Sequence, residues 1–254
     1  VSIQPSELAK VLAVIYVAYQ LDRKPQLVGQ PVFLVPVATV VGFMAFLILA
    51  GKDLGTAALL CLPVAMLMFV AGLPLRWVAF GTLAAPLAVL AAIAFQPYRQ
   101  RRLLAFLDPE AEPLGSGFQL LQSLIAVGSG GIFGLGPGAS VQKLHFLPSP
   151  HADFIYSIVA EELGLLGAAG FLALFGLLLW RGVLAGLAAP DTFGRHLAWG
   201  LTCLLVAQAL VHISVALGML PTTGVPLPFV SHGGSALIAS LIAAGLILNV
   251  SQHG

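Results

Sequence analysis

Seven long runs of apolar residues constrain the fold of this chain more than any other feature of its sequence. A helix crosses the hydrocarbon core of a bilayer in about 17 to 25 residues. Apolar runs of about this length lie at residues 5–20, 32–50, 54–72, 77–96, 154–180, 197–220 and 235–250. We therefore expect an all-α, polytopic membrane protein with about seven transmembrane helices and a large extracytoplasmic loop.

The composition excludes a soluble protein, and the net charge argues against nucleic acid as a partner. Hydrophobic residues make up 59% of the chain and charged residues 8%, whereas soluble domains are about a quarter charged. A net charge of +1 gives no field that would attract nucleic acid, so we expect no nucleic-acid partner. Residues 134–139 match a Gly-x-Gly-x-x-Ala spacing but lack the strand and helix of a dinucleotide site, so no nucleotide cofactor is expected.

The basic residues of the short loops set the orientation in the membrane. If the seven runs cross the membrane alternately, the basic residues of three short loops lie on the same side: Arg23, Lys24, Arg76, Arg181 and Arg195. The positive-inside rule makes that side cytoplasmic. The opposite side then carries residues 97–152 and 218–234. The segments with the most polar residues are therefore predicted to be external.

Residues 97–152 form a connection too long to be an ordinary loop, because structureless loops above about 15 residues are generally functional or disordered. Apolar residues recur at helical spacing between Phe106 and Ile125. We expect an amphipathic helix there, on or dipping into the membrane. The glycine-rich residues 128–138 that follow allow backbone to approach backbone or a ligand closely.

Asp153 immediately precedes the fifth apolar run, so it is predicted to stand near the amino end of a transmembrane helix. One interpretation is a helix cap, in which the carboxylate accepts backbone N–H groups. The other is a general base at the membrane face, with His151 close enough to tune it. The two roles are compatible.

Glu161 and Glu162 lie about two turns into the same run, where a charge at the bilayer centre costs about 2.5 kcal/mol or more. Such groups face the protein interior, pair with a cation or take up a proton. Lys10 is the partner we would test first, with Glu7 one turn before it. A purely structural buried ion pair is the alternative.

Three further positions are candidates for contact with substrate. Lys143 could meet an anionic phosphate, although it could equally be a solvated loop residue. Ser231 and His232 lie in a loop rich in proline and glycine, which fits a rigid re-entrant turn.

Six blocks of the sequence resemble, in matching order, the signature blocks of the SEDS family, the bacterial shape, elongation, division and sporulation proteins. They cover nearly the whole chain: QPSELAK (4–10), DLGT (53–56), FLDP (106–109), PLGSG (113–117), residues 128–167 and PLPFVSHGGS (226–235). Residues 108–117 and 140–148 are more similar to the division branch of the family than to the elongation branch.

The resemblance implies a ten-helix protein of which this chain forms roughly the last seven helices, in the bacterial inner membrane. It also implies a peptidoglycan glycosyltransferase that polymerises lipid II with a class B penicillin-binding protein and other divisome or elongasome proteins. The family's essential acid carries over to Asp153 in the block His151-Ala-Asp153, where Ala152 replaces the usual threonine. His232 replaces a common tyrosine.

From these residues we expect Asp153 to deprotonate the acceptor hydroxyl while Lys10 or Lys143 stabilises the leaving pyrophosphate. A divalent cation, Mg²⁺ or Mn²⁺, would assist, with Asp153 as its candidate ligand. Two rivals remain. A lipid II flippase would use the intramembrane charges, and a scaffold that recruits a transpeptidase would need no acid.

Overall fold

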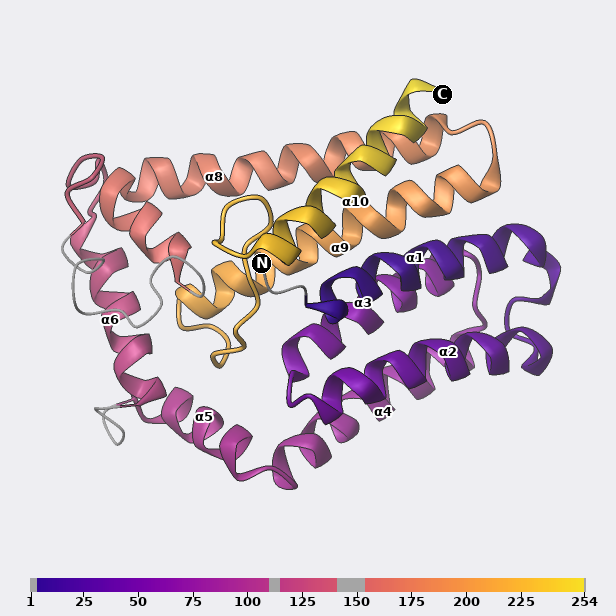
Figure 1. The fold of residues 1–254 in the computed structure, drawn as a ribbon, viewed down its shortest axis with the longest axis horizontal. Helices are drawn as coiled ribbons and strands as arrows, with labels where there is room; N and C mark the ends of the chain where they lie inside the picture. Colours follow the sequence, from indigo (N-terminus) through magenta and orange to yellow (C-terminus); the bar gives the residue numbers. More distant parts are fainter. Residues whose placement is uncertain (1–3, 110–114, 141–153, 254) are drawn as a thin grey trace. The chain divides into compact units, whose positions relative to one another are not determined.

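The computed structural model describes residues 4–109, 115–140 and 154–253, and every regular element within these ranges is a helix. Five helices are long and apolar enough to cross a membrane: α2 (Pro31–Ala50), α4 (Leu75–Ala94), α8 (Ile155–Ala188), α9 (Thr192–Ala216) and α10 (Gly234–Gln252). The other helices are α1 (Pro5–Arg23), η1 (Pro25–Leu27), α3 (Leu54–Val70), α5 (Pro97–Leu107) and α6 (Ser116–Ser129) (Figure 1).

Each of the seven predicted runs coincides with a helix, so the all-α membrane class is confirmed. The expected number of seven crossings is not confirmed, because within the described part of the chain five helices meet the length and hydropathy of a span. Most boundaries differ from the prediction by a few residues, and the largest differences flank the turn between α8 and α9. Helix α8 continues to Ala188, and α9 begins at Thr192.

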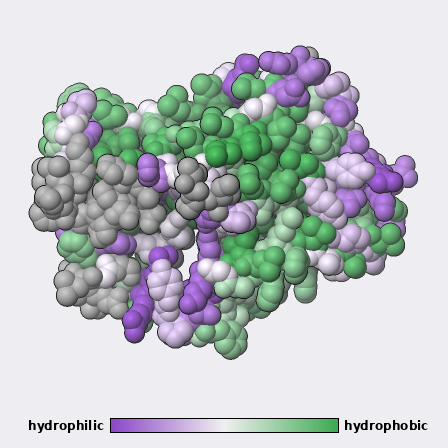
Figure 2. All heavy atoms as spheres, viewed as in Figure 1, coloured by the Kyte–Doolittle hydropathy of each residue, from purple (hydrophilic) through white to green (hydrophobic). Residues whose placement is uncertain are grey.

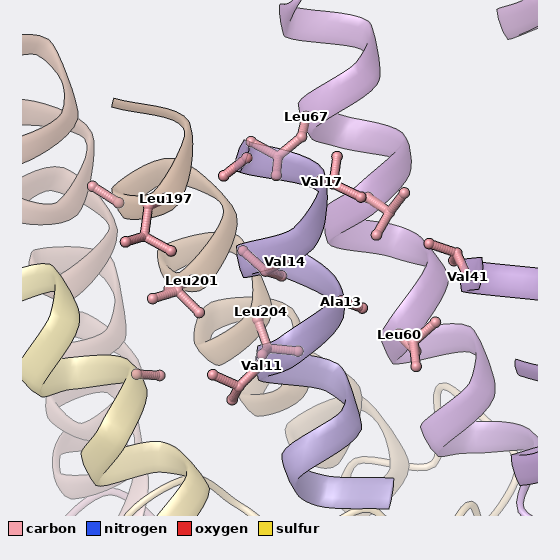
Figure 3. Packing of buried hydrophobic residues seen from close by; sticks show 14 of the residues in the cluster. Val11, Ala13, Val14, Val17, Val41, Leu60, Leu67, Leu197, Leu201 and Leu204 are labelled. Atoms are coloured by element: carbon pink, nitrogen blue, oxygen red, sulfur yellow. The ribbon is translucent and has the colours of Figure 1, made fainter. Parts of the chain in front are cut away.

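The chain divides into two compact units. Unit 1 comprises residues 1–89, 177–207 and 234–254, and unit 2 comprises residues 90–176 and 208–233. In unit 1, α1 packs against α3 and α9 through small and branched apolar side chains, including Val14, Leu67 and Leu201 (Figure 3). The backbones approach so closely that a Cβ on Gly200 would lie 2.5 Å from Val14 Cγ1, as is typical of packed transmembrane helices.

Apolar side chains also cover the outer surface of the helices. Figure 2 shows them across much of the visible face, with hydrophilic residues gathered mainly toward its edges. Helix α4 is the extreme case, because its apolar window contributes no buried residue. A large apolar surface of this kind is stable in lipid rather than in water.

In unit 2 the long connection forms two helices, α5 and α6, where one amphipathic helix was expected. The hydroxyl of Ser123 on α6 meets that of Ser157 on α8 and donates to the carbonyl of Ala216 on α9, 2.7 Å away. Both serines are fully buried. This polar junction joins the middle of α6 to the start of α8 and the end of α9, since a buried hydroxyl requires its partners.

Candidate functional site

Helix α8 is broken at Gly164, which has φ +67° and ψ −168°. A break inside an apolar helix frees backbone N–H and C=O groups that must find other partners. The sequence predicted an uninterrupted helix here. The residues on either side of the break include Glu161 and Glu162.

The freed groups are paired by the glycine loop, which we define as residues 130–136, directly after the end of α6. Leu135 and Gly136 donate to the carbonyls of Glu161 and Glu162, both at 3.0 Å. In return, the amides of Leu165 and Leu166 donate to the carbonyls of Gly131 and Ile132, at 2.9 and 3.2 Å. The broken helix and the loop therefore form one hydrogen-bonded unit.

The glycines of this loop are required by the close approach of the two backbones. A Cβ on Gly130 would lie 2.0 Å from the carbonyl oxygen of Ala160, and one on Gly134 would lie 2.1 Å from that of Glu162. Real Cβ atoms do not come that close to backbone atoms. The sequence predicted that the glycines allow close approach, and the structure shows that they meet the backbone of α8.

The carboxylates of Glu161 and Glu162 are bound by the segment that continues from the glycine loop. The hydroxyl of Ser140 donates to Glu161 Oε2 at 2.6 Å, and the amide of Gly138 donates to Glu162 Oε2 at 3.0 Å. Glu161 and Ser140 are each 1% exposed. A charged group buried to this extent is stabilised by such short, charge-assisted hydrogen bonds.

Replacing Ser140 by alanine is expected to lower the free energy of unfolding by about 1.5–3 kcal/mol, because the buried Glu161 carboxylate would lose a hydrogen-bond donor. The thermal midpoint of the purified protein measures this. Ser129→Ala is the matched control, since its hydroxyl donates to the carbonyl of Ala126 on the surface of the same helix. It is expected to change stability by less than about 0.5 kcal/mol. Equal midpoints for the two variants would contradict the assigned role of Ser140.

Glu7 and Lys10 form an ion pair on α1 in unit 1, with Lys10 Nζ 3.0 Å from Glu7 Oε1. Their exposed fractions are 2% and 1%. The Glu7–Lys10 spacing of one turn, noted in the sequence, is therefore an ion pair within one helix. The pairing of Lys10 with Glu161 or Glu162 stays a prediction. Buried ion pairs in a membrane are costly and mark functional positions.

The α9–α10 loop, residues 217–233, is held by side chains from two helices. Arg102 of α5 donates to the carbonyl of Thr222 at 2.9 Å, while His212 and Gln208 of α9 contact the carbonyls of Val225 and Pro226, both at 2.8 Å. The loop is therefore anchored to two helices by hydrogen bonds, and its rigid re-entrant course stays a prediction.

The two candidate residues in this loop differ in their environment. Ser231 is buried, and its hydroxyl accepts from the amide of Leu227 at 2.8 Å. His232 is exposed. The serine therefore shapes the loop, whereas the histidine is presented at its surface.

Three predicted site residues lie outside the described residues: Lys143, His151 and Asp153. Their proposed roles stay predictions. Within the described ranges, no group of three or more His, Cys, Asp or Glu side chains could hold a metal ion. The candidate ligand Asp153 is not among those residues.

Sequence reasoning missed Ser140 as a partner of Glu161, and it missed His212 and Arg102 altogether. A serine in a loop carries no signal of its own. His212, however, lies in the sixth apolar run, and a histidine inside a membrane span is a functional candidate by default. That signal could have identified it.

Comparison with known proteins identifies the family to which this chain belongs. The model of the FtsW/RodA/SpoVE cell cycle proteins matches residues 1–254. The chain belongs to the FtsW/RodA/SpoVE family. It is 43% identical to a probable peptidoglycan glycosyltransferase FtsW of Geobacter metallireducens, a match that covers 99% of this chain and 68% of that protein. It is 41% identical to the stage V sporulation protein E of Bacillus subtilis, over 99% of this chain and 69% of the other.

Solved structures of the FtsW/RodA/SpoVE family support the fold. One chain of a peptidoglycan synthase complex, described as coordinating polymerization and crosslinking, matches with a TM-score of 0.80 at 37% identity, over 99% of this chain and 70% of that one. The rod shape determining protein RodA of Thermus thermophilus matches with a TM-score of 0.68 at 31% identity, over 99% and 66%. The expected membership of the SEDS family is therefore confirmed, and the protein is a multi-pass membrane protein.

Proposed function

We propose that this protein is a peptidoglycan glycosyltransferase that polymerises lipid II into glycan strands. The observation that carries the proposal is the identity of about two residues in five, across nearly the whole chain, to relatives named probable peptidoglycan glycosyltransferases. Each unit also carries buried charge in an otherwise apolar protein, Glu7 and Lys10 in unit 1 and Glu161 in unit 2, and charges within a membrane mark functional positions. The site lies at the extracytoplasmic face of the bacterial inner membrane.

Asp153 acts as the general base in this mechanism. It takes the proton from the hydroxyl of the acceptor sugar, whose oxygen attacks the anomeric carbon of the donor with inversion. The bond between that carbon and the diphosphate oxygen breaks, and undecaprenyl pyrophosphate leaves with the bonding electrons. Lys143 or Lys10 stabilises its charge, and a divalent cation, Mg²⁺ or Mn²⁺, with Asp153 as ligand, is the proposed cofactor.

The proposed partner is a class B penicillin-binding protein, together with divisome or elongasome proteins. A structural neighbour belongs to a complex that coordinates polymerization and crosslinking, which supports such a partner. A polymerase and a transpeptidase that act on the same strand benefit from association, because it raises the effective concentration of the shared intermediate.

Replacing Asp153 by alanine or asparagine in the intact protein is expected to lower the rate of polymerisation by about 10²–10⁴-fold, which is the usual contribution of a general base. The measurement is glycan length and amount from lipid II in reconstituted vesicles. Asp191→Asn, which neutralises an exposed acid in the turn after α8, should leave the rate unchanged. Undiminished polymer from the Asp153 variants would refute the assigned base, whereas transport of labelled lipid II without any polymer would favour a flippase.

A further inference from the structure

Unit 2 contains a small polar pocket between α5, α6, α9 and the α9–α10 loop. Its volume of about 10 Å³ accommodates one oxygen-sized group. Phe154, which is 1% exposed and directly follows Asp153 in the chain, forms part of its wall. The pocket is lined by Arg102, Gln119, Phe154, His212, Val215, Thr222, Thr223, Gly224 and Val225.

Three polar atoms of this lining are buried without a hydrogen-bond partner among the described residues: Nε2 of His212 and the hydroxyls of Thr222 and Thr223. His212 is 1% exposed. Buried polar atoms nearly always have partners, because an unpaired one forfeits the hydrogen bonds it makes in water. Three such atoms around one pocket point to a ligand that pairs with them.

The hydrogen bonds of His212 determine what its free nitrogen offers. Nδ1 lies 2.8 Å from the carbonyl oxygen of Val225, and a carbonyl only accepts, so Nδ1 carries the proton. In the neutral ring Nε2 then has a lone pair and acts as an acceptor. The histidine therefore requires a ligand that donates a hydrogen bond.

The other groups of the lining can donate. Each threonine hydroxyl can both donate and accept, and the Arg102 guanidinium is a donor held by the Thr222 carbonyl and by the Tyr98 ring, 4.5 Å away. A hydroxyl group donates one hydrogen bond and accepts others, so it matches this set. An anionic oxygen does not match this set, because it has no proton to donate to Nε2. Its negative charge would instead be repelled by the lone pair of Nε2.

We propose that this pocket is a subsite for one hydroxyl group of the saccharide substrate, bound by His212, Thr222 and Thr223. The inference rests on the proposed function, which makes a sugar the substrate. Phe154, which lines the pocket, directly follows the proposed base Asp153 in the chain. A hydroxyl held in the pocket therefore orients the sugar ring for transfer. These residues are positioning residues and take no proton in the reaction.

The test is the variant Thr222→Val/Thr223→Val, which removes both hydroxyls with little change in shape. In the intact protein, reconstituted with lipid II, we expect KM to rise about tenfold or more and kcat to change by less than about threefold. Thr222→Ser/Thr223→Ser retains both hydroxyls and should keep KM near the wild-type value. Thr202→Val is the matched control, because it removes another buried, unpaired hydroxyl that lies in unit 1.

The outcomes separate this proposal from its alternatives. An unchanged KM in the double valine variant would overturn it, and the pocket would then hold only a structural water. If that variant does not fold, the single variant Thr223→Val takes its place in the test, and its KM is expected to rise about threefold. Equilibrium binding of labelled lipid II is the second measurement. Wild-type protein that binds lipid II without making polymer would refute the proposed function, while the ratio of Kd between variants still decides the subsite.

Discussion

Replacing Gly134 by alanine is expected to destabilise the protein by about 4 kcal/mol and to abolish most of its activity. The new Cβ would lie 2.1 Å from the carbonyl oxygen of Glu162 and 2.7 Å from the amide nitrogen of Gly164. Both are backbone atoms, so no flexible side chain can move aside. Gly134 also has φ +80°, which costs a non-glycine residue about 1–2 kcal/mol more.

The loss should extend beyond one contact, because the loop would separate from the break in α8. Four backbone hydrogen bonds join the glycine loop to residues 161–166, and each buried group left unpaired costs about 1–3 kcal/mol. Glu161 and Glu162 would lose their fixed geometry at the same time. The measurements are the thermal midpoint in detergent and the rate of polymerisation, which we expect to fall by more than about 100-fold.

Alanine variants of two other glycines, in residues 128–138, distinguish the effect of steric clash from that of backbone strain. Gly136 has φ +106° but open space around its Cβ position, so Gly136→Ala should show the cost of strain alone. Gly128 in α6 has neither feature, and alanine there should be neutral or stabilising by up to about 1 kcal/mol. A midpoint for Gly134→Ala as high as that for Gly136→Ala would show that the two backbones do not meet as described.

The positions of the helices could be predicted from the sequence because lipid imposes a simple rule. Each apolar run had to be long enough to cross the bilayer or to pack within it, and all seven runs lie in helices. Boundaries were less predictable. Helix α8 includes Arg181, which the hydropathy pattern placed in a loop, because a charged residue near a helix end can extend its side chain toward the interface.

The break at Gly164 could not be predicted, since its cause lies about thirty residues earlier in the chain. Gly164, Gly167 and Gly170 resemble the small residues common in packed transmembrane helices. Only the hydrogen bonds from Leu135 and Gly136 explain why the first of them ends a helical segment. The glycine-rich stretch indicated close approach to some backbone, but nothing in its residues indicated which one.

The candidate site was predicted in part, because a charge in lipid is informative whatever it contacts. The free-energy cost of placing a charge inside the membrane identified Glu7, Lys10, Glu161 and Glu162 as candidates before their partners were known. The spacing of Glu7 and Lys10 on one helix indicated their contact, and the structure shows it. The contact of Ser140 with Glu161 depends on tertiary packing, so the sequence could not predict it. The role of Asp153 stays a prediction.

Replacing Lys10 by methionine is expected to be nearly as destabilising as the change at Gly134. The Glu7 carboxylate, which is 2% exposed, would lose the ammonium group 3.0 Å away. Removing one partner of a buried ion pair typically costs about 3–5 kcal/mol, because the remaining charge stays in a medium that solvates it poorly. The thermal midpoint should fall accordingly, and polymerisation from lipid II should fall with it.

The double variant Glu7→Gln/Lys10→Met separates the structural role of the pair from a functional one. With both charges removed, neither member of the pair is left behind as an isolated charge, and the midpoint should rise above that of Lys10→Met. If Lys10 stabilises the departing diphosphate, polymerisation should nevertheless stay low, because stability has risen without the cation. Recovery of both midpoint and activity would make the pair purely structural. A double variant no more stable than Lys10→Met would show that an uncompensated Glu7 charge is not what destabilises the single one.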